Sequence, residues 1–172
     1  ASNDSDFEMG SLVSGNHRDH GFSIDTWMYL DSGNSNGSGI FSFGDNYSIH
    51  IFGGDLIFQL QDADAGASTF QSIKVAAADL AFDQWAHYAF TYNGQGYSDA
   101  HQGLKVYIDG VEVTTVFHAD AGTYVAMDTD NTNTFNIGVS SGGSRFTGQL
   151  DNVAVYDYML TAGQVNSHYK RG

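Results

Sequence analysis

"RFTGQLDNVAVYDYMLTAGQVNSHY", residues 145–169, contains a strand that leads directly into a short helix. Residues 148–157 are mostly apolar and carry β-branched and aromatic side chains, which is the pattern of a strand. Thr161 and Gln164 have the spacing of a capping box, which marks the beginning of a helix. Val165 provides an apolar side chain one turn on, so we expect this helix to seal the rim of a sheet.

Short segments of the same kind recur along the whole chain between clusters of turn-forming residues. The chain has no Pro and no Cys, so its turns depend on Gly, Asn, Asp and Ser. The segments expected to be strands are residues 21–30, 39–44, 47–53, 55–61, 70–76, 85–92, 104–110, 111–118, 135–138 and 148–157. This pattern predicts an all-β fold, an antiparallel sandwich of two sheets with a short C-terminal helix, formed by residues 1–172 as one domain.

Two tight turns and two core positions can be named. Gly53-Gly54 and Asp109-Gly110 each lie between alternating runs and tolerate the positive φ of two-residue hairpin turns. Trp27 and Trp85 are expected to be core anchors, because large aromatic side chains fill a sandwich. His87 shares a strand face with Trp85, and we expect it to be a structural histidine that bonds to a neighbouring strand. Gly148 is expected to permit a bend or a close approach of strands.

The charge of the chain restricts its partners. The sequence has 20 acidic and 6 basic residues and a net charge of -14, which disfavours nucleic acid and anionic membrane surfaces. Cations and neutral polar molecules such as sugars fit better, although the acidity can also serve only to keep a secreted protein soluble. No apolar run reaches the roughly 20 residues that cross a bilayer, so no membrane insertion is expected. No signal segment opens the chain, and we expect Ala1 to mark a processed start.

Several segments occur in an order that resembles one known family. They are "FSIDTWMYL", "WAHYAFTYNG", "LKVYIDGVEV", "FNIG" and "FTGQLDNVAVYDYMLTAGQVNSHY". Together they resemble the laminin-G-like and pentraxin-like branch of the concanavalin A-like lectin/glucanase superfamily, over roughly residues 20–170. The resemblance implies a jelly-roll sandwich and an extracellular location, secreted or on the cell surface. It also implies a place among other modules of the same chain, and frequently a bound calcium ion.

The superfamily includes glycan hydrolases and lyases, but this sequence lacks their motifs. Glycosidases place two carboxylates across the scissile bond, and the family's hydrolases carry them in a Glu-x-Asp-x-x-Glu strand. Glu8 and Glu112 are the only glutamates of the chain, and no such strand is present. The Arg, Gln-x-His and Tyr signatures of the lyase branch are also missing. We therefore expect a non-enzymatic protein.

Calcium is the expected metal, because acidic and Asn-rich loops supply the oxygen ligands that it prefers. Asp6 and Glu8 lie in an acidic N-terminal stretch, and Asp151 interrupts the last apolar strand. The resemblance implies that Asp151 and oxygens near the N-terminus hold a structural Ca²⁺ ion. Two alternatives stay open. Asp151 can be a carboxylate that binds no metal and is exposed or hydrogen-bonded to backbone amides. Separately, residues 128–133, "DTDNTN", can form a metal loop of their own. The pentraxin calcium site is not expected, because residues 139–143 lack its acidic run.

A ligand site is expected on loops at one rim of the sandwich. Sugar sites combine aromatic platforms with side chains that bond hydroxyl groups. The residues that qualify are Asn93, Tyr97, Asp99, His101 and Arg145. Facing strands offer a second set on a concave sheet, namely Tyr47, His50 and Gln59. The alternative is that all of these are ordinary exposed turn residues.

These observations predict a non-catalytic module that binds a glycan or polysaccharide and carries a structural calcium ion. The parent protein is expected to be secreted or displayed on the cell surface, such as an adhesin or a polysaccharide-degrading enzyme. A structural or protein-interaction module is the main alternative, and a glycan hydrolase or lyase is the third.

Overall fold

The computed structural model describes residues 10–13, 16–34, 36–44, 46–62, 69–127, 134–140 and 142–172, with only the backbone described over residues 10–18. Its elements are β1 (Gly10–Val13), β2 (Asn16–Asp19), β3 (Phe22–Leu30), β4 (Ser38–Phe43), β5 (Tyr47–Phe52), β6 (Asp55–Gln61), β7 (Phe70–Val75), η1 (Ala77–Asp79), β8 (Trp85–Tyr92), η2 (Tyr97–Gly103), β9 (Leu104–Ile108), β10 (Val111–Glu112), β11 (Val116–Ala121), β12 (Phe135–Ile137), β13 (Gly148–Tyr156) and α1 (Ala162–Tyr169).

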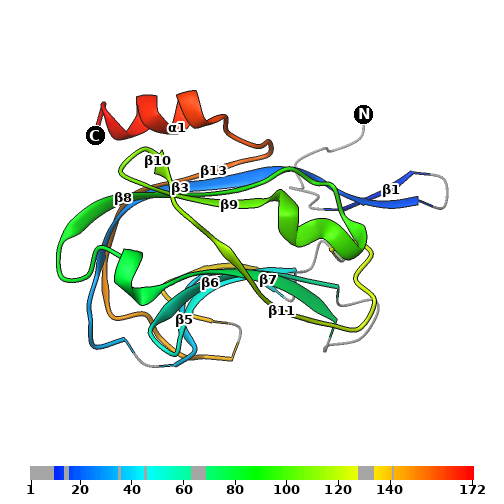
Figure 1. The fold of residues 1–172 in the computed structure, drawn as a ribbon, viewed down its shortest axis with the longest axis horizontal. Helices are drawn as coiled ribbons and strands as arrows, with labels where there is room; N and C mark the ends of the chain where they lie inside the picture. The colour runs from blue at the N-terminus through cyan, green and yellow to red at the C-terminus, as the bar shows by residue number, and fades with distance from the viewer. Residues whose placement is uncertain are drawn as a thin grey trace.

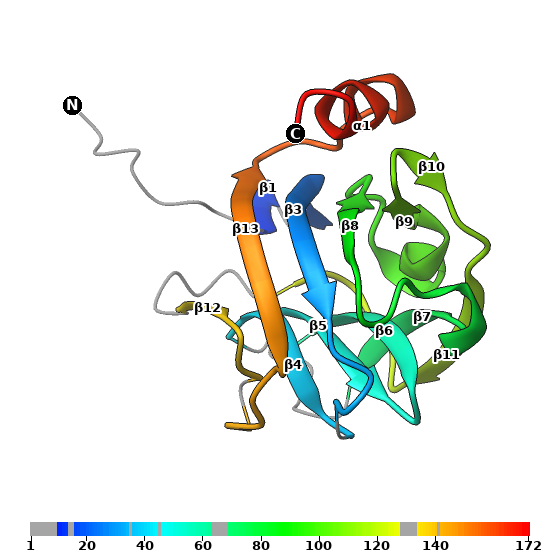
Figure 2. The ribbon, with the colours of Figure 1, turned by 90° about the vertical axis from the view of Figure 1, so that its left-hand side faces the viewer.

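Two antiparallel sheets face each other, as the sequence predicts. One has the strand order β10-β9-β8-β3-β13 and the other β11-β7-β6-β5-β4-β12, while β1 and β2 form a separate hairpin. Figure 1 shows the sheets as two layers, and Figure 2 shows α1 above the five-stranded sheet. The predicted all-β sandwich with a short C-terminal helix is therefore confirmed.

An aromatic core fills the space between the sheets. Phe22 stacks on Tyr47 with ring centroids 4.5 Å apart, and Phe90 makes edge contacts with Phe41 and Phe58 at 6.4 and 5.9 Å. All five side chains are fully buried. Because side chains alternate between the two faces of a strand, this core fixes which residues point outward.

Both expected hairpins are present. Gly53 and Gly54 have φ values of 64° and 86°, and Asp109 and Gly110 have φ values of 50° and 76°. Positive φ at both central residues is the geometry of type I′ turns, which match the twist of the strands that they connect. The local turn chemistry therefore determines the register of β5 with β6 and of β9 with β10.

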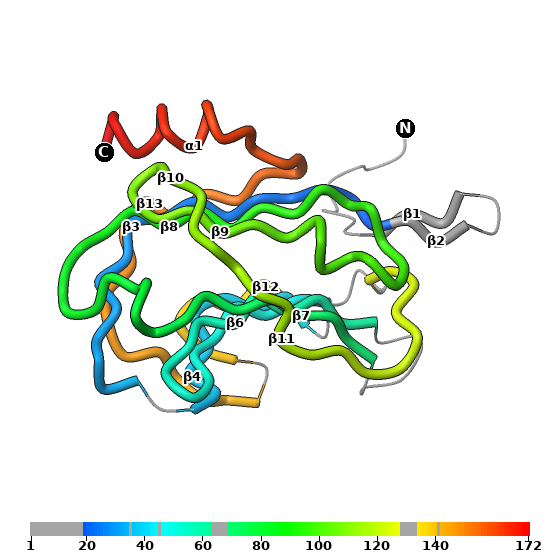
Figure 3. The backbone as a smooth tube through the Cα atoms, viewed as in Figure 1, coloured from blue at the N-terminus to red at the C-terminus, as the bar shows by residue number. Residues whose placement is uncertain are grey.

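Three expectations were wrong in placement. Trp27 and Trp85 are not core anchors: Trp85 is 45% exposed and Trp27 is half-buried. The side chains that point into the core at this part of β8 and β3 are those of the adjacent residues Ala86 and Met28. Residues 111–118 do not form one strand, since β10 lies at the edge of one sheet and β11 at the edge of the other. Helix α1 does not seal a rim: it lies on the outer face of the five-stranded sheet, on the side away from the six-stranded sheet (Figure 3).

Gly148 is the first residue of β13, and there is no space for a Cβ atom at this position. Its φ is 151°, and a Cβ atom added there would lie 2.1 Å from the Tyr29 carbonyl oxygen. The close approach that the sequence predicts at Gly148 is therefore present. By contrast, Gly163 in α1 has only the Thr161 hydroxyl within 4.0 Å of an added Cβ.

We expect Gly148→Ala to lower the free energy of unfolding by about 1–3 kcal/mol, because both its φ and its contact with Tyr29 oppose a Cβ atom. The matched control, Gly163→Ala in the first turn of α1, should raise it by up to about 1 kcal/mol, since alanine has a higher helix propensity than glycine. Urea unfolding of the two variants measures both changes. Equal stabilities for the two variants would contradict this account.

Candidate functional site

The outer face of the five-stranded sheet carries a mixed polar and aromatic surface beneath helix α1. Asp25 and Trp27 of β3 alternate with the inward-facing Ile24 and Met28, so they point outward. His87 of β8 lies directly across from Trp27 in the register. The burial of the alternate side chains in the core therefore brings three polar or aromatic residues together.

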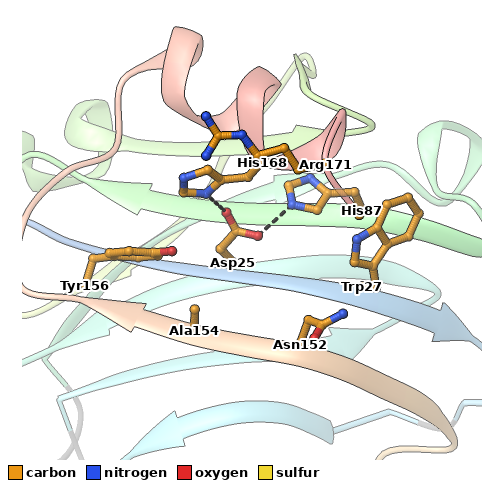
Figure 4. Close-up of a pocket in the computed structure, with 9 residues that line it drawn as sticks. Asp25, Trp27, His87, Asn152, Ala154, Tyr156, His168 and Arg171 are labelled. Carbon is orange, nitrogen blue, oxygen red and sulfur yellow. Dashed lines mark hydrogen bonds and ion pairs between the residues drawn. The ribbon is translucent and has the colours of Figure 1, made fainter.

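The carboxylate of Asp25 bridges two imidazoles. His87 Nε2 lies 2.6 Å from Oδ1 of Asp25, and His168 Nδ1 of helix α1 lies 2.5 Å from Oδ2 (Figure 4). An ionised carboxylate only accepts hydrogen bonds, so both imidazoles donate. Burial raises the pKa of Asp25, but the hydrogen bonds and charges of His87 and His168 outweigh it, and the net pKa lies below its usual value. Asp25 therefore stays ionised and holds the end of α1 on the sheet.

Helix α1 is positioned by its cap and by an apolar contact. The Thr161 hydroxyl oxygen accepts a hydrogen bond from the backbone N–H of Gln164, and the side-chain oxygen of Gln164 accepts one from the backbone N–H of Thr161, so the predicted capping box is confirmed. Leu160 and Val165 are fully buried against Ala89 and Tyr107 of the sheet. The helix thus makes one wall beside the polar surface, and it delivers His168 to Asp25.

A bulge in β13 makes the opposite wall. Asp151 pairs with Trp27 and Ala154 pairs with Asp25, so β13 has one residue more than β3 between these two pairs. Asn152, within the bulge, has a φ of 53°, a left-handed value that asparagine tolerates better than most residues. The bulge turns the side chain of Asn152 toward the space below α1 (Figure 4).

The two walls enclose a groove, which we call the outer groove. One part has a volume of about 330 Å³, and its lining residues are Asp25, Trp27, His87, Asn152, Ala154, Tyr156, His168, Arg171 and Gly172. A second part of about 190 Å³ shares Trp27, Asn152 and Gly172 with the first and adds Trp85 and Asp151. Both parts combine aromatic surfaces with charged and amide groups.

Four of the five ligand residues that the sequence predicts lie together at one end of the sandwich. Asn93, Tyr97, Asp99 and His101 belong to the segment that follows β8 and forms η2. Tyr97 is 45% exposed, whereas His101 hydrogen-bonds Gln71 through Nδ1 at 2.9 Å. Their role in binding stays a prediction.

That end of the molecule is held by a buried carboxylate that sequence reasoning missed. Asp19 accepts hydrogen bonds from the hydroxyls of Tyr92 and Tyr124, at 2.5 and 2.6 Å, and from the Met127 amide. Burial raises the pKa of Asp19 in spite of these bonds. Because its donors come from well-separated segments, Asp19 ties residues 124–127 to the end of β8.

Arg145 lies at the other end of the sandwich. Its backbone forms isolated β-bridges with Gly39 and Val139, and β13 begins three residues later, paired with Leu30. Strand β8 begins near Leu30 and finishes at Tyr92, so the η2 segment follows at the far end. Figure 1 shows the two segments at opposite ends, and the structure does not unite Arg145 with the other four predicted residues.

The second predicted set is divided between two faces. Tyr47 was expected on a concave surface, but it is fully buried in the core because it alternates with outward-facing Ser48. His50 and Gln59 lie on the outer face of the six-stranded sheet, both half-buried. Burial and the nearby His118 lower the pKa of His50 to about 4, so this imidazole is uncharged at neutral pH.

The predicted calcium ligands are only partly described. Asp6 and Glu8 lie outside the described residues, as do all of residues 128–133. Asp151 is exposed at the groove, and its Oδ1 accepts the Asn152 amide at 2.8 Å. Over the described ranges, no group of three His, Asp or Glu side chains is arranged to hold a metal ion. Asp151 alone does not fit calcium, and the ion stays a prediction that depends on the N-terminal carboxylates.

The chain belongs to the concanavalin A-like lectin/glucanases superfamily, whose sequence model matches residues 4–166. The family that the sequence resembles is therefore confirmed. No curated protein matches the sequence significantly. Among the described residues, no helix is both long and apolar enough to cross a membrane.

Solved structures with the same fold include receptor-binding domains of botulinum neurotoxins. The type G domain aligns with a TM-score of 0.60 at 18% identity, covering 90% of this chain and 39% of that one. The serotype D domain in complex with N-acetylneuraminic acid gives 0.60 at 16% identity, with 94% and 37% covered. The DC domain in complex with rat synaptotagmin II gives 0.55 at 16% identity, with 88% and 36% covered. This chain spans less than half of each neighbour, and the likeness shows a shared fold.

We expect Asp25→Asn to lower the free energy of unfolding by about 2 kcal/mol at neutral pH, because the buried bonds to His87 and His168 lose their charge. The pKa of Asp25 in the folded chain lies below its unfolded value of 3.8. Its stabilising effect is thus complete above that value and is lost as the pH falls through the folded pKa. Urea unfolding measured from neutral pH to pH 3 should show the free energies of unfolding of the unchanged protein and of Asp25→Asn converging as the pH falls. A constant difference, or an equal loss in the exposed control Asp99→Asn, would refute the assignment.

Proposed function

We propose that this domain is a non-catalytic carbohydrate-binding module and that the outer groove is its binding site. The observation that carries the proposal is the position of Trp27, which lines both parts of the groove next to hydrogen-bonding groups that are already fixed. Sugar rings present apolar faces that stack on aromatic side chains, and hydroxyl edges that need directed polar partners. The outer groove supplies both kinds of surface.

The polar groups of the groove suit hydroxyl groups, which both donate and accept hydrogen bonds. The amide of Asn152 donates and accepts, and the guanidinium of Arg171 donates. Asp25 has a fixed orientation because two imidazoles hold it. Side chains locked in this way lose little conformational entropy when a ligand binds.

Two further observations support a glycan over other ligands. The net charge of -14 disfavours nucleic acid. One neighbour in fold, the serotype D domain, is solved with N-acetylneuraminic acid bound. Another is solved with rat synaptotagmin II, which keeps a protein-interaction module as the alternative.

The groove is poorly suited to glycoside hydrolysis. That reaction requires a carboxylic acid that stays protonated, with a raised pKa, opposite a second carboxylate. The pKa of Asp25 is instead lowered, and the groove's other described carboxylate, Asp151, is exposed to solvent. This electrostatic setting supports binding without catalysis. We further propose that the domain works outside the cell, as one module of a larger secreted or surface protein.

Trp27→Ala should weaken glycan binding about 30-fold, as expected when an aromatic anchor worth about 2 kcal/mol is removed. Tyr97→Ala is the matched control, since Tyr97 is an exposed aromatic residue in the predicted rim set at the far end of the domain. A glycan array identifies ligands, and calorimetry on the best of them measures the affinities. Loss of binding in the Tyr97 variant alone would place the site at the rim. A silent array with folded protein would favour the protein-interaction alternative.

The structural calcium ion gives a separate prediction. If Asp151 and the N-terminal carboxylates bind Ca²⁺, adding calcium after chelation should raise Tm, because a ligand at 100 times its Kd stabilises the folded state by about 2.7 kcal/mol. The shift should vanish in Asp151→Asn and persist in the exposed control Asp99→Asn. Identical melting curves with calcium and with chelator would remove calcium from the account.

A further inference from the structure

The outer groove is long in one direction. Its residues succeed one another along the β3–β13 pair: Tyr156 lies across from Ser23, Ala154 from Asp25, and Asp151 from Trp27. Tyr29 follows next on β3, and there Trp85 of β8 lies across from it. Because strands rise about 3.3 Å per residue, the six steps from Ser23 to Tyr29 span roughly 20 Å. This length exceeds that of a single sugar ring several times.

Aromatic side chains are spaced along the whole groove. Tyr156 and Trp27 stand at opposite ends of the first part, as Figure 4 shows, and Trp85 extends the series into the second part. Between Tyr156 and Asn152 the β13 residue that lines the groove is Ala154, whose side chain is small. Platforms separated by a small side chain suit successive rings of one chain.

The ends of the groove are exposed to solvent. At one end Trp85 is 45% exposed and the neighbouring Gln149 is exposed; at the other, Tyr158 beside Tyr156 is 47% exposed. A site for a chain terminus needs a wall against which the last sugar rests. Within the described part of the chain, neither end of the groove has such a wall among its lining residues.

The charges along the groove disfavour a polyanion. Each part holds a carboxylate, Asp25 in the first and Asp151 in the second, while Arg171 is the one Lys or Arg among the described residues that lines either part. The net charge of -14 adds a general repulsion of anionic chains. An uncharged ligand avoids both costs.

We propose that the outer groove binds an internal stretch of an uncharged, linear polysaccharide, lengthwise along β3 and β13. This inference rests on the proposed carbohydrate-binding function and specifies its ligand class. Trp27 anchors the middle of the chain, and Trp85 contacts sugars that a short oligosaccharide does not reach.

The test uses soluble β-glucan, xylan and galactan as neutral probes and polygalacturonate as the charged probe. For the neutral polysaccharide that binds best, calorimetry then follows a series from the monosaccharide to the hexasaccharide. We expect affinity to rise at least tenfold along the series, and reduction of the chain end to leave the affinity of the hexasaccharide unchanged. A monosaccharide that binds as tightly as the hexasaccharide, or tighter binding of polygalacturonate, would overturn the inference while the carbohydrate-binding function stands.

Variants locate the extended contact. Trp85→Ala should weaken hexasaccharide binding about tenfold and leave disaccharide binding unchanged, whereas Trp27→Ala should weaken both. The control is Phe52→Ala, because Phe52 is 52% exposed at the end of β5 in the other sheet. Equal effects of Trp85→Ala on the two ligands, or no effect on either, would overturn the lengthwise arrangement. Binding to none of these polysaccharides would overturn this inference, whereas a glycan array without any ligand would overturn the proposed function as well.

Discussion

The burial of one face of every central strand between the two sheets is the constraint on which the rest of the molecule depends. Phe22, Ile24 and Met28 must point inward to complete the aromatic core. Because a strand has a side-chain period of two, Asp25 and Trp27 are then forced outward. A slip of one residue in β3 would bury a carboxylate and expose the core. The same free energy that stabilises the sandwich therefore fixes the face on which the groove lies.

Two local departures from regular structure turn this outward face into a groove. The bulge after Asp151 shifts the phase of β13, so that Val153 packs on the core while Ala154 and Tyr156 face outward with Asp25. The helix then covers Ala89 and Tyr107, and burial of Leu160, which precedes its N-cap, contributes about 1.5–3 kcal/mol. Neither feature makes a site alone, because the bulge supplies one wall and the helix the other.

The fold followed from the sequence because its signals are local: the alternation of strands, the Asp109-Gly110 turn and the Thr161–Gln164 capping box each need only neighbouring residues. The groove did not follow, because its residues come from three distant segments that only the sheet register brings together. The sequence did carry a signal for the bulge. Leu150 and Val153 are three residues apart, whereas Val153 and Val155 are two apart, and a strand that keeps its apolar side chains on one face needs an extra residue to span a spacing of three. Trp27 and Trp85 lie outside the core because strand alternation, and not side-chain size, determines which residues of β3 and β8 point inward.

The Asp25 cluster also explains how a strongly acidic protein can present a carboxylate to the neutral ligand that we propose. Taking a free carboxylate out of water costs several kcal/mol, and a ligand that covered one would have to offset that cost. The desolvation of Asp25 has already occurred during folding, offset by the bonds from His87 and His168. A ligand that covers the groove therefore displaces water mainly from Trp27, Tyr156 and Asn152, where stacking and amide hydrogen bonds replace what is lost. Selectivity then depends on the spacing of the aromatic rings and the direction of the fixed hydrogen bonds, both of which are set by strands rather than by loops.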